Sequence, residues 1–502
     1  MTTHARIGSR EINYNPHPKF LGITYDRQLT FAKHADIIAD KVKQRARALI
    51  KLANTDWGYP KKNLKATYIA TGRSLIEYCS PAWHPWLSAT SLEKLEKAQR
   101  FAARVITGQL KTTPTESLHV ESELPPIEIR SRQQAVIAYE KSMRLNQENP
   151  RKKLATKQVP TRTKKTDWRN QARNLWDDIF NQEQKVSEFP PLQKQWKPMP
   201  EVSFKYAAVT KKSNTTKEDL YKASKEILDE TKKTTKLSIY TDGSAINSNT
   251  YGGAGVIIYK DDKELMKICM PAGRWTSSFQ SEMVALSEAL KICEHMEDMS
   301  IRIVTDSQST MMRLENTWTT KTPNDHIEAN IIKSLEKCAQ NGAKFTMVWC
   351  PSHCGTEGNE AADKLAEEGT RLEQNIPYTY ETAKTCIRRH IRAPPLRHPT
   401  IRRIYQDGRK KDNDLTRSEQ VNISRLRCNH HTSLRYWTHK VGLTEDDRCR
   451  LCGLTSETVE HIFERCNGMN DERGEIDVTI LNTNPKKALN FWKKWEARAG
   501  SA

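Results

Sequence analysis

Apolar positions at helical spacing dominate the first part of the chain. One run carries them at every third or fourth residue: Phe31, Ala35, Ile38, Val42, Ala46 and Leu49. This period predicts a helix. A second helix is predicted to begin near Thr90, which has capping-box spacing with Glu93, and to end at Gly108. Residues 15–145 therefore read as a small all-helical domain.

The helical pattern stops over residues 150–235. The stretch from Arg151 to Lys165 contains basic residues and no acidic one, and prolines interrupt the chain at positions 190, 191, 198 and 200. A solvated basic linker is the simplest interpretation. An arm that follows a nucleic-acid backbone is compatible with the same residues.

A third pattern begins at residue 236 and ends at about residue 372. Strand-like runs occupy 236–242, 252–259, 301–305 and 345–349, and helical runs occupy 278–297, 325–341 and 357–369. Strands followed by alternating helices and strands predict an α/β domain with a mixed sheet. A basic connector over 376–427 then leads to a Cys/His-containing region over 428–495.

Composition narrows the class of partner. The 502 residues carry a formal net charge of +20, which favours a polyanion, with nucleic acid first; a merely soluble basic surface is the alternative. No apolar run reaches 18 residues and no secretory signal is seen at the start, so neither a membrane partner nor secretion is expected. We expect a nuclear or cytoplasmic protein, in which clustered Cys and His read first as metal ligands.

Two apolar strands each end in an aspartate. Asp242 follows Leu237, Ile239 and Tyr240, and Asp306 follows the run IRIVT. Ligands of open sheets bind beyond the strand ends, so adjacent strands would bring both carboxylates to one point. The alternative is that each Asp only terminates a strand at a turn.

Two further carboxylates and a histidine belong to the same region. Glu282 lies at the edge of the apolar stripe of the 278–297 helix, where a carboxylate is costly unless it is paired or bound to a cation. Asp363 lies on the flank of a short helix after a glycine-rich loop that carries His353. A loop histidine beside carboxylates is a candidate proton shuttle.

These four segments resemble the type 1 ribonuclease H family. The motifs YTDGS, SEMVAL, VTDSQS and PSHCGTEGNEAAD occur in the family's order over residues 236–370. The resemblance implies a five-stranded mixed sheet flanked by helices and hydrolysis of RNA in RNA–DNA hybrids. It further implies two Mg²⁺ ions, which Mn²⁺ can replace. By the same resemblance Asp242, Glu282, Asp306 and Asp363 bind the metal, His353 aids product release, and Ser244, Asn247, Gln280 and Ser281 touch the hybrid.

The flanking segments point to a mobile element. Residues 15–145, which include KFLGITYDRQLTFAKHADIIADKV, resemble the palm end and thumb of a non-LTR retrotransposon reverse transcriptase, without the upstream acidic palm motif. The resulting hypothesis is an endonuclease on a truncated retrotransposon protein. A non-catalytic nucleic-acid-binding remnant remains the alternative. An integrase or transposase uses a different acidic arrangement, without the early-helix Glu and the His–Gly loop.

A Cys/His element stands near the C-terminus. Cys449, Cys452, His461 and Cys466 have the spacing C-x2-C-x8-H-x4-C, which suits structural Zn²⁺. The same segment resembles the element that follows ribonuclease H in these retrotransposons. Unligated cysteines are the alternative. The other candidate ligands are upstream: Cys428, His430, His431 and His439. Arg425, Arg427, Arg435 and Trp437 are candidate contacts to phosphates and bases.

Overall fold

A computed structural model describes most of the chain. The described residues are 5–12, 14–157, 168–180, 201–208, 216–246, 251–320, 323, 325–352, 355–406, 412 and 414–500. The chain folds into two compact units. The helical unit comprises Met1–Ala135, Thr161–Trp168 and Ile391–Ala502, and the sheet unit comprises Val136–Pro160 and Arg169–His390. No helix in the described part of the chain has the length and apolar character that a membrane span requires.

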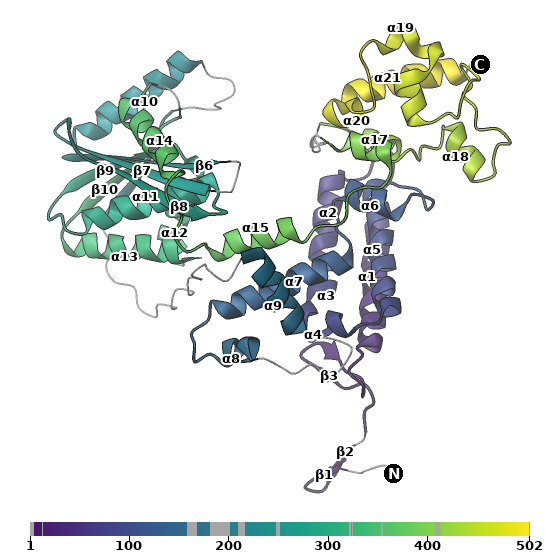
Figure 1. The fold of residues 1–502 in the computed structure, drawn as a ribbon, viewed down its shortest axis with the longest axis horizontal. Helices are drawn as coiled ribbons and strands as arrows, with labels where there is room; N and C mark the ends of the chain where they lie inside the picture. Colours follow the sequence, from purple (N-terminus) through teal and green to yellow (C-terminus); the bar gives the residue numbers. More distant parts are fainter. Residues whose placement is uncertain are drawn as a thin grey trace. The chain divides into compact units, whose positions relative to one another are not determined.

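A six-stranded mixed sheet forms the centre of the sheet unit (Figure 1). Its spatial order is β5-β10-β9-β6-β7-β8. The strands are β5 (Val202–Tyr206), β6 (Leu237–Ile246), β7 (Tyr251–Lys260), β8 (Lys263–Arg274), β9 (Ser300–Thr305) and β10 (Lys344–Trp349). The neighbours β5, β10, β9 and β6 run parallel, whereas β6, β7 and β8 form antiparallel pairs.

The expected number of five strands is wrong by one. The additional strand, β5, lies in the stretch expected to be a linker and pairs in parallel with β10 from Phe345↔Val202 to Trp349↔Tyr206. Val202, Phe204 and Tyr206 alternate with polar residues and pack their apolar side chains against the core. Because a parallel partner is distant in sequence, nothing beside β5 in the chain signals the pairing.

Helices cover both faces of this sheet. The helices of the sheet unit are α8 (Pro150–Thr156), α9 (Trp168–Phe180), α10 (Lys217–Lys232), α11 (Ser278–Cys293), α12 (Gln308–Thr320), α13 (His326–Gln340), α14 (Glu357–Gly369) and α15 (Tyr380–His390). Odd-numbered side chains of β6, such as Ile239, share the core with α11. Even-numbered side chains lie on the opposite face, where the start of α14 packs over the ring of Tyr240.

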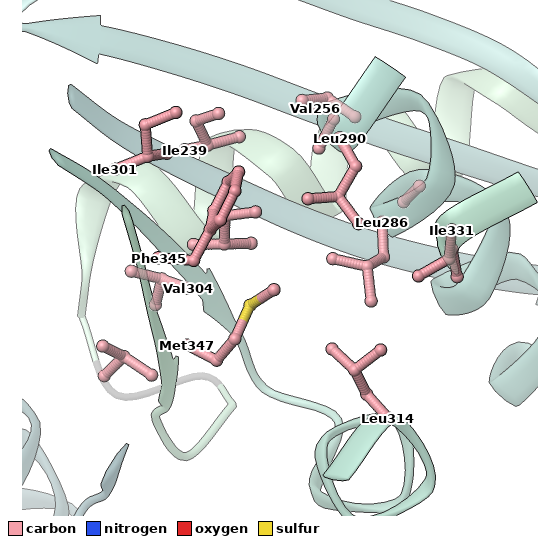
Figure 2. Packing of buried hydrophobic residues seen from close by; sticks show 14 of the residues in the cluster. Ile239, Val256, Leu286, Leu290, Ile301, Val304, Leu314, Ile331, Phe345 and Met347 are labelled. Atoms are coloured by element: carbon pink, nitrogen blue, oxygen red, sulfur yellow. The ribbon is translucent and has the colours of Figure 1, made fainter. Parts of the chain in front are cut away.

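The hydrophobic core of the sheet unit lies between the sheet and α11, α12 and α13. Figure 2 shows its centre, in which Leu286 and Leu290 of α11 lie beside Val256 of β7, with Phe345 and Met347 of β10 in the same layer. These side chains are 2% exposed or less. The core fixes the strand ends that carry the aspartates.

The helical unit joins the two ends of the sequence. Its helices are α1 (Ala32–Ile50), α2 (Lys61–Tyr68), α3 (Ser74–Glu77), α4 (Ser80–Trp83), α5 (Ala89–Thr107), α6 (Thr115–Ser122), α16 (Pro399–Ile404), α17 (Arg417–Arg427), α18 (Arg435–Lys440), α19 (Asn470–Arg473), α20 (Ile480–Thr483) and α21 (Pro485–Gly500). The boundary between the units falls within α7 (Ile127–Met143). Two short hairpins precede α1: β1 (Ala5–Ile7) with β2 (Arg10–Ile12), and β3 (Lys19–Phe20) with β4 (Ile23–Thr24).

Both helices expected near the start of the chain are confirmed, with one different cap. Gly108 ends α5 with a φ of 69°, the left-handed conformation that glycine adopts at little cost. The capping box expected at Thr90 is wrong, because the N-cap is Ser88, whose hydroxyl accepts from the Ser91 N–H. The serine two residues earlier competes for the same role.

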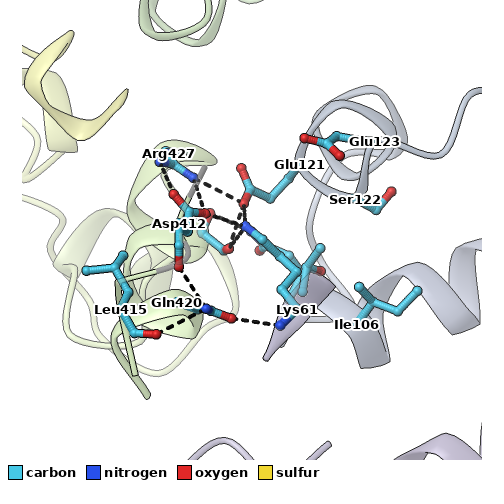
Figure 3. A network of polar contacts seen from close by, with 12 residues as sticks. Lys61, Ile106, Glu121, Ser122, Glu123, Asp412, Leu415, Gln420 and Arg427 are labelled. Carbon is cyan, nitrogen blue, oxygen red and sulfur yellow. Dashed lines mark hydrogen bonds and ion pairs between the residues drawn. The ribbon is translucent and has the colours of Figure 1, made fainter. Parts of the chain in front are cut away.

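A buried ionic network ties the N-terminal helices to the C-terminal segment (Figure 3). The Lys61 ammonium lies 2.6 Å from a Glu121 carboxylate oxygen and 2.8 Å from one of Asp412. Arg427 binds Asp412 through both terminal nitrogens, at 3.0 and 2.9 Å. All four side chains are almost fully buried. Removing any one of these charges would leave its partners buried and unpaired, which is strongly destabilising. The network therefore stabilises the packing of these segments against one another.

Candidate active site

Two strand ends bring the first pair of carboxylates together. Thr241 on β6 is paired in parallel with Thr305 on β9. The next residue on each strand is an aspartate, so Asp242 and Asp306 stand side by side at the same edge of the sheet. The Asp242 carboxylate also accepts a 2.7 Å hydrogen bond from the Gly243 N–H. The interpretation of these residues as simple strand terminators is therefore insufficient.

A close backbone approach adds Glu282. A Cβ atom placed on Gly243 would lie 2.0 Å from the Glu282 backbone nitrogen, so only glycine lets β6 lie this close to α11. The Thr305 hydroxyl lies 3.4 Å from a Glu282 carboxylate oxygen and donates to it. Carboxylate oxygens of Asp242, Glu282 and Asp306 all lie within 4.8 Å of one another.

Asp363 approaches from the helix on the opposite side. A Cβ atom on Gly255, the residue paired with Asp242, would lie 2.1 Å from the Ala362 carbonyl oxygen. This contact presses α14 onto β7 beside Asp242. Asp363 is half-buried, and its carboxyl is near enough to raise the pKa of Asp242. All four predicted carboxylates thus converge.

The site concentrates carboxyl groups whose ionisation is opposed by burial and by one another. Burial, followed by the charge of Asp306, raises the pKa of Asp242 to about 7. Burial, followed by Asp242 and Asp306, also raises the pKa of Glu282 well above its usual value. No cation of the chain pairs with Asp242 or Glu282 among the described residues. An oxygen-only donor set with this charge fits Mg²⁺ or Mn²⁺.

The residues that were predicted to contact the hybrid differ in how deeply they are buried. Ser244 is half-buried beyond Asp242 on β6. Ser281 is 0% exposed, and Gln280 is also buried, its amide bonded to the hydroxyls of Thr379 and Thr382. Ser281 therefore presents no surface to a substrate, whereas Gln280 is among the residues that line a pocket of about 350 Å³. His353 and Asn247 lie outside the described residues.

Comparison with known proteins assigns this domain. The RNase H family profile matches residues 234–371. The ribonuclease H of Pseudomonas entomophila (strain L48) is 30% identical over 143 residues, covering 92% of that protein and 26% of this chain. This chain belongs to the ribonuclease H family.

Two further proteins are similar to this domain. The ribonuclease H of Campylobacter jejuni (strain RM1221) is 32% identical over 136 residues, which cover 89% of that protein and 26% of this chain. A crystal structure of a ribonuclease H1 from compost, in complex with an RNA/DNA hybrid, is 23% identical with a TM-score of 0.23. That comparison covers 27% of this chain and 96% of the compost protein.

The Cys/His element forms a second cluster, in the helical unit. Cys449, Cys452, His461 and Cys466 place their ligand atoms within 4.8 Å of one another. The sulfur atoms of Cys449 and Cys466 are 3.6 Å apart, near the roughly 3.8 Å expected across a tetrahedral zinc with bonds of about 2.3 Å. His461 points Nε2 at the Cys452 sulfur, at 3.2 Å, while its Nδ1 contacts the Thr455 hydroxyl at 3.0 Å. A second contact of this kind fixes the tautomer of a ligating histidine.

The upstream candidates have other partners. His430 contacts the Cys428 carbonyl oxygen through Nδ1, and the ring of His431 packs edge-on against Trp492. Arg427 is fully buried in the ionic network, so its expected phosphate contact is wrong. The Trp437 indole N–H donates to the Thr112 hydroxyl.

Proposed function

We propose that this chain is an endonuclease that hydrolyses the RNA strand of RNA–DNA hybrids in a metal-dependent reaction of the type 1 class. The convergence of Asp242, Glu282, Asp306 and Asp363 at one sheet edge carries the proposal. A non-catalytic binding remnant has no need for Asp242 and Glu282, whose pKa values are raised by burial and then by neighbouring carboxylates, since such an arrangement destabilises the fold unless cations bind.

The chain's own groups would hold and order the reaction centre. The Gly243 N–H and the Thr305 hydroxyl fix one oxygen each of Asp242 and Glu282. When bound, two Mg²⁺ ions supply an activated water and charge stabilisation of the leaving oxygen. Asp242 would hold the metal together with its neighbours Asp306 and Glu282. Preference for RNA follows from the 2′-hydroxyl, for which the half-buried Ser244 is a candidate contact.

A labelled hybrid provides the test. The full chain should cleave the RNA strand of an RNA–DNA hybrid in Mg²⁺ and should not cleave the same DNA as a DNA–DNA duplex. EDTA should stop the reaction. Hybrid binding without any cleavage, in either Mg²⁺ or Mn²⁺, would leave only the binding-remnant interpretation.

The flanking parts complete the proposal. We propose that residues 15–145 derive from the palm end and thumb of a retrotransposon reverse transcriptase. Zn²⁺ at Cys449, Cys452, His461 and Cys466 would be structural, since four protein ligands leave no open position for chemistry. A reducing compartment, the cytoplasm or nucleus, suits these thiols.

A further inference from the structure

A polar pocket lies between α10 and the sheet, on the face that carries Asp242. Its volume is about 420 Å³, and its lining includes Tyr221, Lys225, Tyr240, Tyr259, Arg302 and Thr356. α10 precedes the segment that matches the family profile. The pocket is therefore built partly from chain that lies outside the matched domain.

Arg302 is a buried cation without an anionic partner. It is 3% exposed. Among the described residues its three partners are uncharged: the Leu228 carbonyl oxygen and the hydroxyls of Thr231 and Ser238. The Nε–H has no hydrogen-bond partner in the part of the chain that the structure describes. The carbonyl end of α10 supplies only a partial negative charge, so the guanidinium retains the capacity to bind an anion.

The rest of the pocket offers a mixed set of contacts. Lys225 adds a second, exposed cation from α10. Lys232 is already paired with Asp262 at 2.6 Å. Asp229 and Glu357 are exposed residues of the lining and can accept hydrogen bonds from sugar hydroxyls or base amines. Tyr221 and Tyr259 supply aromatic rings on which a base can stack.

We propose that this pocket binds a single nucleotide unit, with its phosphate on Arg302 and Lys225. A guanidinium matches phosphate geometry through its planar fork, and the remaining lining suits a sugar and a base. The unit comes either from a free mononucleotide or from a nucleic-acid strand. The proposal does not depend on hybrid cleavage.

The pocket is separate from the carboxylate cluster. Ser238 and Tyr240 line it and precede Asp242 by four and two residues on the same face of β6. At about 3.3 Å per residue these positions lie roughly 13 and 7 Å from Asp242 along the strand. Metal at the carboxylates is therefore not needed for binding in the pocket.

Binding should be measured on the full chain in EDTA. Calorimetry with adenosine 5′-monophosphate, beside adenosine and inorganic phosphate, tests the free nucleotide. Fluorescence anisotropy with a labelled five-nucleotide single strand tests the strand. Lys225→Ala should weaken the bound species about tenfold, whereas Lys222→Ala, an exposed lysine on the same helix outside the pocket, should have no effect. Asp242→Asn should also bind as the wild type does.

Arg302 needs a variant that keeps the fold. Arg302→Lys retains the charge and loses the fork, so it should bind more weakly than wild type, and Arg302→Gln should abolish binding while its thermal unfolding remains cooperative. Binding of the monophosphate identifies a free-nucleotide site, and binding of the strand alone identifies a strand site. If neither probe binds, or if Lys225→Ala and Lys222→Ala behave alike, the proposal is overturned.

Discussion

Asp242 binds its proton more tightly in the folded protein than an ordinary aspartate does. Its pKa is raised to about 7 by burial and then by Asp306. A carboxyl whose folded pKa lies above its unfolded value stabilises the fold below the unfolded pKa, and this stability is lost as the pH rises through the folded pKa. Without metal, the ionised cluster should therefore destabilise the protein near pH 8.

Asp242→Asn removes the unfavourable buried charge and should therefore raise the free energy of unfolding. In EDTA at pH 8 we expect a gain of at least about 1.4 kcal/mol, the equivalent of one pKa unit, measured by denaturant unfolding. The gain should shrink at pH 5, where Asp242 is protonated. Glu368→Gln, an exposed carboxylate on α14, serves as the control. A gain independent of pH would contradict the assigned charge repulsion.

The same substitution should abolish catalysis. A neutral amide would hold the metal far more weakly than a carboxylate does, and several kcal/mol of charge stabilisation would be lost with it. At 1.36 kcal/mol per tenfold change in rate, cleavage by Asp242→Asn or Asp306→Asn should fall about a thousandfold or more. Hybrid binding should persist, because the basic residues are unchanged. Near wild-type cleavage by Asp242→Asn would refute the catalytic assignment.

Sequence reasoning finds residues whose pattern is local. Asp242 and Asp306 each interrupt an apolar strand, and that interruption is visible in the sequence. The burial of Ser281 is not visible, because it depends on how closely α11 lies against β6 through Gly243. Arg302 is likewise, in the sequence, a single charged residue within an apolar strand, and nothing beside it indicates whether it is buried. Arg302 is buried because α10 packs over it, and the pattern of apolar residues in the strand does not predict this packing.

At the scale of elements, clear runs of apolar residues predict their strands, whereas a short strand in a proline-rich stretch is not predicted. The alternating or apolar runs of β6, β7, β9 and β10 predict those strands within a few residues. β5 was missed because a short strand in a proline-rich stretch has only a distant partner. A tight hairpin turn joins β7 to β8: Asp261 and Asp262 have φ values of 49° and 62°, typical of a two-residue turn.

The Cys/His element makes a sharp prediction at this scale. Metal analysis of the full chain should give about one zinc per molecule, and Cys452→Ser should remove it, since the remaining three ligands no longer close the tetrahedron. Cys79→Ser, at an exposed cysteine outside the cluster, should keep the zinc. Hybrid cleavage should survive Cys452→Ser, because the carboxylates lie in the sheet unit. A zinc-free native protein would refute the assignment.

At the scale of the whole molecule, the helical unit depends on contacts between distant segments. The Lys61 backbone N–H donates to Gln420, 359 positions away, and Arg417 donates to the carbonyl oxygens of Val105 and Ile106. Charge and periodicity describe each segment alone, so they predict separate terminal regions. The joining of these regions in one unit follows from complementary buried charges that become neighbours only on folding.

Asp412→Asn tests this joining. Burial acts to raise the pKa of Asp412, but Lys61 and Arg427 outweigh it and hold the pKa below its usual value. A depressed pKa gives stability that is present above the unfolded value and is lost as the pH falls through the folded one. The variant leaves Lys61 and Arg427 short of one buried counter-charge, so we expect the helical unit to lose about 3 kcal/mol at pH 7.

The pH dependence separates this effect from a simple packing defect. The loss should stay constant from pH 7 down to about the usual Asp pKa of 3.9, and should shrink only below it. Asp446→Asn, which breaks an exposed pair with Arg448, should cost much less stability than Asp412→Asn, because exposed ion pairs contribute little. Hybrid cleavage measured beside unfolding should be unchanged, since Asp412 and the carboxylate cluster belong to different units. A loss in Asp412→Asn no larger than that in Asp446→Asn would mean that the network does not hold the two ends of the chain together.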